Sequence, residues 1–178
     1  MITLSVSGNG VIRASYRAKK YDGMIEIKKA FEDLTPEEYD QILDAPVWIS
    51  LMAAYAGDGI LSADEKAGAV KLAGLRTYTA PKSLREYYKL VDSRFEERFD
   101  RLNKRLPASE HDKELYMKTQ MKKVYDIMLK IDRDVAVDLE KSLASFYEKV
   151  FKSHDSFFRY FALPVISDRW GKDDRPEQ

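Results

Sequence analysis

Apolar residues recur at spacings of three and four from about residue 24 onward, which is the pattern of amphipathic helices. Several predicted helices begin at a Ser or Thr followed three residues later by an acidic residue, a pairing that caps a helix N-terminus. These start signals are Thr35–Glu38, Ser62–Glu65, Ser83–Glu86 and Ser109–Asp112. The pattern predicts an all-α, multihelical bundle of about seven helices.

Two of the predicted helices, Val47–Ala56 and Ala63–Arg76, are largely apolar. A helix without a polar face must be buried on most sides. We therefore expect these two helices to lie at the centre of the fold. Gly74 interrupts the second of them, which suggests that a neighbour packs closely there.

The next helix is predicted to run from Ser83 to Leu106 without interruption and to end at Pro107. Two further helical segments follow, and the charged stretch 132–134 separates them. Their apolar stripes consist of Leu115, Met121, Val124, Tyr125 and Met128, and then of Leu139, Leu143, Phe146, Tyr147, Val150 and Phe151.

The two ends of the chain differ from this helical region. Residues 1–23 contain alternating apolar positions and a Ser-Gly-Asn-Gly turn, which fits either a short hairpin or a tail. Residues 171–178 are polar and are expected to form a tail. This leaves residues 24–170 as a single predicted helical domain.

Composition narrows the classes of function. The 178 residues include 30 Lys and Arg against 30 Asp and Glu, a zero net charge that argues against a general nucleic-acid binder. Cysteine is absent, and residues 1–10 have no signal-peptide pattern, so a cytoplasmic location is expected. The longest uncharged run, 45–57, is too short for a transmembrane helix.

Sequence signatures of the common enzyme classes are also missing. His111 and His154 stand alone, without the spacing of a zinc pair. The chain contains neither a Gly-rich phosphate loop nor a Gly-x-Ser-x-Gly elbow. An enzymatic function is therefore not favoured.

An acidic loop between the two apolar helices is the most informative stretch. Asp58 is followed by Gly59, which allows a tight turn, and Glu65 lies at the start of the next helix. Two carboxylates and nearby loop carbonyls are hard oxygen ligands of the kind that Ca²⁺ or Mg²⁺ prefers. The alternative is plain capping, with Glu65 bound to the Ser62 amide and Asp58 to loop amides.

The pattern of an apolar helix, Asp58-Gly59, five residues and Glu65 resembles the TerB-like family of tellurite-resistance and related bacterial proteins. The resemblance implies a multihelical fold with a pseudo-repeated pair of helical units. It also implies a stress-associated scaffold or sensor role, often in membrane-proximal complexes, and a cation site at the acidic cluster. It does not imply a catalytic activity.

A second copy of the motif would be expected later in the chain, and the nearest candidate is 132–140, with Asp132 and Asp138 as weaker ligands. This stretch departs from the pattern because Arg133 replaces the glycine and the spacing is one residue longer.

Two other features are candidate partner surfaces. Arg94, Arg98, Arg101 and Arg105 follow one another at spacings of four, three and four, so a continuous helix would place them on one face. That face could bind an acidic protein, the headgroups of a membrane as a peripheral contact, or nucleic acid. Alternatively it is a solvated face, with Glu97 paired to Arg101 and Asp100 to Lys104. The aromatic segment Phe157–Val165 forms either core or a partner surface.

These observations lead to three hypotheses. The first is a non-enzymatic TerB-like scaffold or sensor that binds a divalent cation at Asp58 and Glu65. The second is a metal-dependent hydrolase that uses the same carboxylates, aided by Asp132 or Asp138. The third is a helical adaptor whose protein partner binds the C-terminal aromatic segment.

Overall fold

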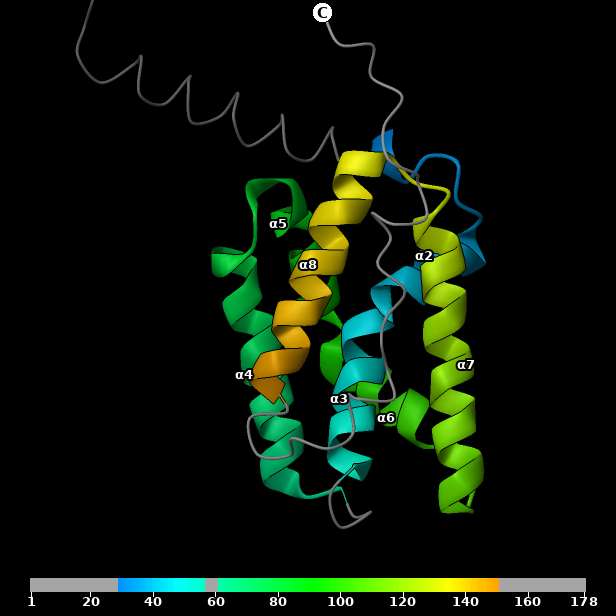
Figure 1. Ribbon diagram of the computed structural model, residues 1–178. Helices are drawn as coiled ribbons and strands as arrows, with labels where there is room; N and C mark the ends of the chain where they lie inside the picture. The colour runs from blue at the N-terminus through cyan, green and yellow to red at the C-terminus, as the bar shows by residue number, and fades with distance from the viewer. Residues whose placement is uncertain (1–28, 57–60, 151–178) are drawn as a thin grey trace, which may run out of the picture.

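The computed structural model describes residues 29–56 and 61–150, and in these residues it is an all-α bundle, as predicted (Figure 1). The described part contains seven α-helices and one short 3₁₀ turn, η1. In chain order they are α2 (Pro36–Leu43), α3 (Ala45–Tyr55), α4 (Ala63–Thr79), η1 (Lys82–Leu84), α5 (Arg85–Ser93), α6 (Phe95–Asn103), α7 (Glu110–Met128) and α8 (Arg133–Val150).

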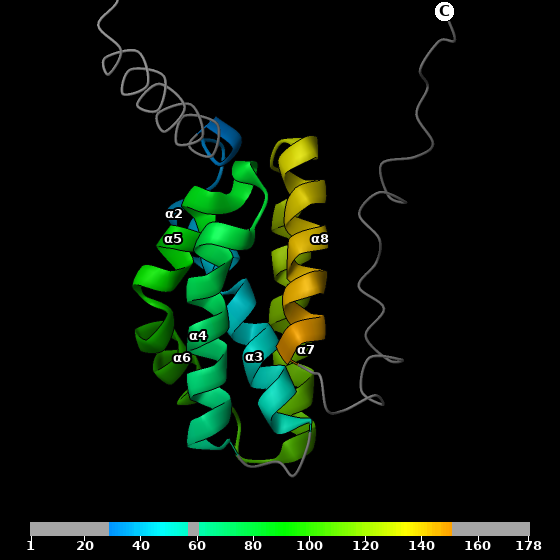
Figure 2. The same ribbon diagram turned by 90° about the vertical axis from the view of Figure 1, so that its left-hand side faces the viewer.

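Helix α3 lies at the centre of the bundle, as its apolar sequence predicted (Figures 1 and 2). Every residue from 45 to 54 is buried, and α3 contacts α4, α6, α7 and α8. The single hydroxyl in this stretch belongs to Ser50, whose Oγ donates a hydrogen bond to the Pro46 carbonyl at 2.8 Å. This bond allows a polar side chain to sit in the core without an unmet hydrogen bond.

Helix α4 is buried on one face only, which corrects the expectation of a second fully enclosed helix. Its buried residues are Ala69, Ala73, Arg76 and Thr77, whereas Leu75 is 50% exposed. The many alanines and the glycines of α4 made it look apolar all round. Ala63, Ala67 and Gly68 are exposed, and their small side chains carry so little apolar area that their exposure costs little free energy.

Three of the predicted N-terminal caps are confirmed. Thr35 and Glu38 form a reciprocal capping box, with N–O distances of 3.1 and 3.2 Å. The same arrangement joins Ser62 and Glu65, and Ser109 accepts a hydrogen bond from the amide of residue 112. The fourth prediction is wrong, because Ser83 lies within η1 and its Oγ donates to Asp138 at 2.6 Å.

The long helix predicted from Ser83 to Leu106 is divided into η1, α5 and α6. The chain leaves helical geometry at Arg94, where φ is −135° and ψ is 17°. An unbroken 24-residue helix would be about 36 Å long at 1.5 Å per residue. The break instead lets α5 pack against α4 while α6 packs against α3. No proline or glycine marks it in the sequence, so tertiary packing imposes it.

The core is rich in aromatic rings whose polar ends are satisfied. Tyr87, Tyr88, Phe95, Phe99 and Phe146 are fully buried. The Tyr87 hydroxyl donates to the Ile42 carbonyl at 2.9 Å, and the Tyr88 and Ser142 hydroxyls lie 2.8 Å apart. These bonds remove the cost of burying the two phenol groups.

Some sequence expectations for the later helices need correction or lie outside the described residues. Leu115 was assigned to the buried stripe of α7, but its side chain is 58% exposed. The described helices share one core cluster.

The predicted domain limits at 24 and 170, the hairpin or tail at 1–23 and the tail at 171–178 lie outside the described residues. Within the described residues, no helix has both the length and the apolar content needed to span a bilayer.

The two glycines of α4 allow a matched test of the packing. An alanine Cβ at Gly68 would meet nothing within 4 Å, while one at Gly74 would lie 3.3 Å from Asp92 Oδ1. Replacing a helix-interior glycine by alanine contributes about 0.5–1 kcal/mol when nothing opposes it. We therefore expect Gly68→Ala to raise the free energy of unfolding by about that amount and Gly74→Ala to raise it less. Urea denaturation measures both, and an equal gain would contradict the close approach at Gly74.

Candidate functional site

The acidic loop predicted as a cation site is described only in part. Asp58 and Gly59 lie outside the described residues. Glu65 Oε2 accepts hydrogen bonds from the Ser62 amide and from Ser62 Oγ, each at 2.8 Å. The Glu65 carboxylate therefore holds the first turn of α4, as the capping interpretation predicted.

The two weaker candidates, Asp132 and Asp138, also have structural partners. Asp132 Oδ1 accepts hydrogen bonds from the amides of Asp134 and Val135, at 3.0 and 3.2 Å, and so caps the start of α8. Asp138 Oδ2 accepts the hydrogen bond from Ser83.

The two acidic regions do not meet in space. The N-terminal end of α4, which carries Glu65, and the N-terminal end of α8, which carries Asp132 and Asp138, lie at opposite ends of the bundle (Figures 1 and 2). Within the described ranges, no three His, Asp or Glu side chains are grouped in a way that could hold a metal ion. The described carboxylates therefore do not assemble a paired site from the two motif copies.

A surface hollow of about 480 Å³ lies at the end of the bundle where α8 begins. Its charged lining consists of Glu32, Asp33, Asp132, Asp134 and Asp138 together with Lys29 and Lys130. Lys130 also forms an ion pair with Glu38, which lowers the pKa of that carboxyl through the hydrogen bond from Lys130. Sequence reasoning missed this hollow because its walls come from segments about one hundred residues apart.

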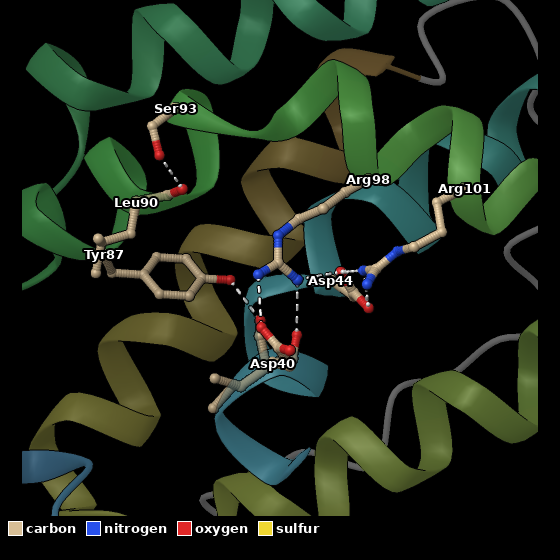
Figure 3. A network of polar contacts seen from close by, with 8 residues as sticks. Asp40, Asp44, Tyr87, Leu90, Ser93, Arg98 and Arg101 are labelled. Atoms are coloured by element: carbon tan, nitrogen blue, oxygen red, sulfur yellow. Dashed lines mark hydrogen bonds and ion pairs between the residues drawn. The ribbon is translucent and has the colours of Figure 1, made fainter. Parts of the chain in front are cut away.

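The predicted arginine stripe is not a single exposed face. Arg98 is buried, and its guanidinium donates to Asp44 Oδ1 at 2.5 Å and to Asp40 Oδ1 at 2.7 Å (Figure 3). Arg101 donates to the same Asp44 carboxylate at 3.1 and 3.2 Å. We call Asp40, Asp44, Arg98 and Arg101 the arginine network. It joins α6 to α2 and to the junction between α2 and α3.

The charges of the arginine network are mutually stabilised. Burial raises the pKa of Asp44, and the hydrogen bond and charge of Arg98 oppose part of that rise. Burial alone would lower the pKa of Arg98, but the hydrogen bonds that Arg98 donates to Asp40 and Asp44, and the charges of these carboxylates, outweigh it and raise the pKa. Arg98 therefore stays charged, and its charge is neutralised inside the protein.

The other two arginines of the predicted stripe, Arg94 and Arg105, are exposed. Arg94 lies at the break between α5 and α6, so it does not continue the helical register of Arg98 and Arg101 in α6. The predicted local pairs are replaced by contacts between helices: Arg101 pairs with Asp44, and Asp100 pairs with Lys66 at 2.7 Å. Binding of an anionic partner at Arg94 and Arg105 remains a prediction.

A further set of polar contacts runs along one side of α8. Asp138, Ser142 and Ser145, which we call the α8 polar seam, follow at helical spacings of four and three. They bond in turn to Ser83 of η1, Tyr88 of α5 and Arg76 of α4, at 2.6, 2.8 and 3.0 Å. The signal that could have revealed the seam is the pair of serines inside the apolar stripe that begins at Leu139.

Of the two histidines and the aromatic segment, only His111 lies in the described residues. His111 is exposed in the first turn of α7. His154 and the aromatic segment Phe157–Val165 lie outside the described residues.

Comparison with known proteins yields no assignment: no family model, no curated protein and no solved structure matches the chain significantly. The function must therefore be argued from the residues themselves.

Removing Arg98 tests whether the arginine network holds the helices together. Arg98→Met leaves Asp44 with Arg101 alone, and breaking a buried ion pair typically costs about 3–5 kcal/mol. We expect a loss of that order in the free energy of unfolding, measured by chemical denaturation. Arg105→Met is the matched control and should change stability by less than about 0.5 kcal/mol, because Arg105 is exposed. Equal effects of the two substitutions would contradict the role assigned to Arg98.

Proposed function

We propose that this chain is a non-enzymatic, TerB-like helical protein that acts as a scaffold or sensor in a cytoplasmic stress response. The observation that carries the proposal is that the described candidate carboxylates form structural hydrogen bonds. Glu65, Asp132 and Asp138 each bind a backbone amide or a hydroxyl that fixes a helix end or a contact between helices. In the described residues these carboxylates serve the fold, whereas a catalytic carboxylate must be within hydrogen-bond reach of the proton that it transfers.

The proposal includes a divalent cation, Ca²⁺ or Mg²⁺, at the acidic loop. Asp58 supplies the first carboxylate of that site, and Glu65 supplies the second by exchanging its cap bonds for the ion. The support comes from the motif between two helices and from the place of Glu65 in the first turn of α4. Hard oxygen ligands of this kind suit either ion.

The second candidate function is a metal-dependent hydrolase. The observation that favours it is the acidic hollow, because Asp132 and Asp138 line it together with three further carboxylates. Two observations stand against it. No three described His, Asp or Glu side chains, those of the hollow included, are grouped so that they could hold a metal ion. The hollow and the start of α4 also lie at opposite ends of the bundle (Figure 1). A helical adaptor that binds its partner through Phe157–Val165 is the third candidate.

Thermal unfolding in the presence of divalent cations tests the proposal. If Ca²⁺ or Mg²⁺ binds the folded chain, a concentration of one hundred times Kd should stabilise it by about 2.7 kcal/mol. We expect this stabilisation to be lost in Asp58→Asn and in Glu65→Gln. Ser62→Ala is the matched control, because it removes the two bonds of the Ser62 hydroxyl but keeps both carboxylates, and it should retain the cation response.

Two results would contradict parts of the proposal. If no divalent cation shifts the unfolding curve of the wild type, the cation site is wrong. If the wild type hydrolyses a phosphate ester with added Mg²⁺ and Asp58→Asn does not, the protein is an enzyme and the hydrolase interpretation replaces the scaffold.

A further inference from the structure

Arg76 is a buried cation that has no counter-charge among the residues 29–56 and 61–150. Its residue is 5% exposed, on the face of α4 that points toward α8. Its Nη2 donates one hydrogen bond, to Ser145 Oγ at 3.0 Å, and its Nε is buried without a hydrogen bond, as are the Nε atoms of Arg98 and Arg101. Among the described residues, no carboxylate lies within ion-pair distance of Arg76.

Arg98, the other buried arginine of the described residues, is paired with carboxylates. Arg98 is 6% exposed, almost the same as Arg76, yet it bonds to two carboxylates, those of Asp40 and Asp44. An arginine side chain keeps its proton in proteins, so burial cannot neutralise it. A buried charge without a partner costs several kcal/mol, and natural folds pair such charges or use them to bind a ligand.

The surroundings of Arg76 suit an anion. Ser145, its hydroxyl partner, is half-buried, so the guanidinium end of the side chain lies near the surface. Lys141 and Lys149 are exposed one turn before and one turn after Ser145 on the same side of α8. Glu148 is the acidic residue nearest to Ser145 in the sequence and is exposed to solvent. Two lysines thus flank Ser145 on α8, and Glu148 lies beside one of them.

We propose that Arg76 and Ser145 form a binding site for a small oxyanion of the phosphate class at the contact between α4 and α8. A guanidinium offers five N–H donors in a planar fork that matches the oxygens of a phosphate. One donor binds Ser145, and in the proposed site the anion binds the remaining ones, the buried Nε–H among them. The Ser145 hydroxyl donates a further bond to it. This site is independent of the divalent-cation site and of the proposed scaffold role.

The test measures the response of the Arg76 side chain to phosphate in the full-length wild type. The Nε–Hε resonance of Arg76 is recorded by ¹H–¹⁵N NMR during a titration with sodium phosphate, and sodium chloride at the same ionic strength serves as the reference. We expect a saturable shift of this resonance in phosphate and none in chloride, together with a rise in the unfolding temperature. The absence of a saturable shift in the wild type would overturn the proposal, whatever the variants do.

Variants make the assignment specific. Arg76→Lys keeps the charge but loses the fork, and we expect phosphate to bind about tenfold more weakly. Arg133→Lys is the matched control at an exposed arginine in the first turn of α8 and should leave phosphate binding unchanged. Ser145→Ala should also weaken binding. If phosphate raises the unfolding temperature of Arg76→Lys as much as that of the wild type, the anion binds elsewhere and the proposal is wrong.

Discussion

The burial of α3 on all sides is the constraint on which the other helices depend. Ten consecutive residues of this helix are buried. Because α3 carries no polar face, helices must surround it, and α4, α6, α7 and α8 do so. Each of them then needs an apolar face directed inward and a polar face directed outward. The break at Arg94 has the same origin, since a straight helix through that point would leave α3 uncovered on one side.

Polar contacts decide how the outer helices are attached to this apolar centre. The arginine network fastens α6 to α2 through two carboxylates, and the α8 polar seam fastens α8 to η1, α5 and α4. Hydrophobic burial supplies most of the driving force for folding but has little directional preference. Buried hydrogen bonds with short distances add direction, because a partner left alone inside the protein is costly.

Much of the fold could be predicted from the sequence, because its signals are local. The caps at Thr35 and Ser62 and the apolar run of α3 depend on neighbouring residues and were interpreted correctly. The break at Arg94 and the burial of Arg98 depend on contacts between helices that are far apart in the chain. No local pattern shows that a carboxylate from α2 will meet an arginine from α6. The acidic hollow and the α8 polar seam could not be predicted either, because both are formed by segments that are far apart in the chain. Asp58, on which the predicted cation site depends, lies outside the described residues.

The α8 polar seam limits the alternative packings that helix α8 can adopt. Leucine and phenylalanine side chains tolerate a helix that slides or rotates by one turn, since one apolar contact can replace another. Three polar bonds at spacings of four and three residues match only one axial position and one rotation of α8. A shift by a single turn would break all three of these bonds, including the buried one between Tyr88 and Ser142. The seam therefore selects one native arrangement among several of similar hydrophobic burial, which is a contribution to uniqueness more than to stability.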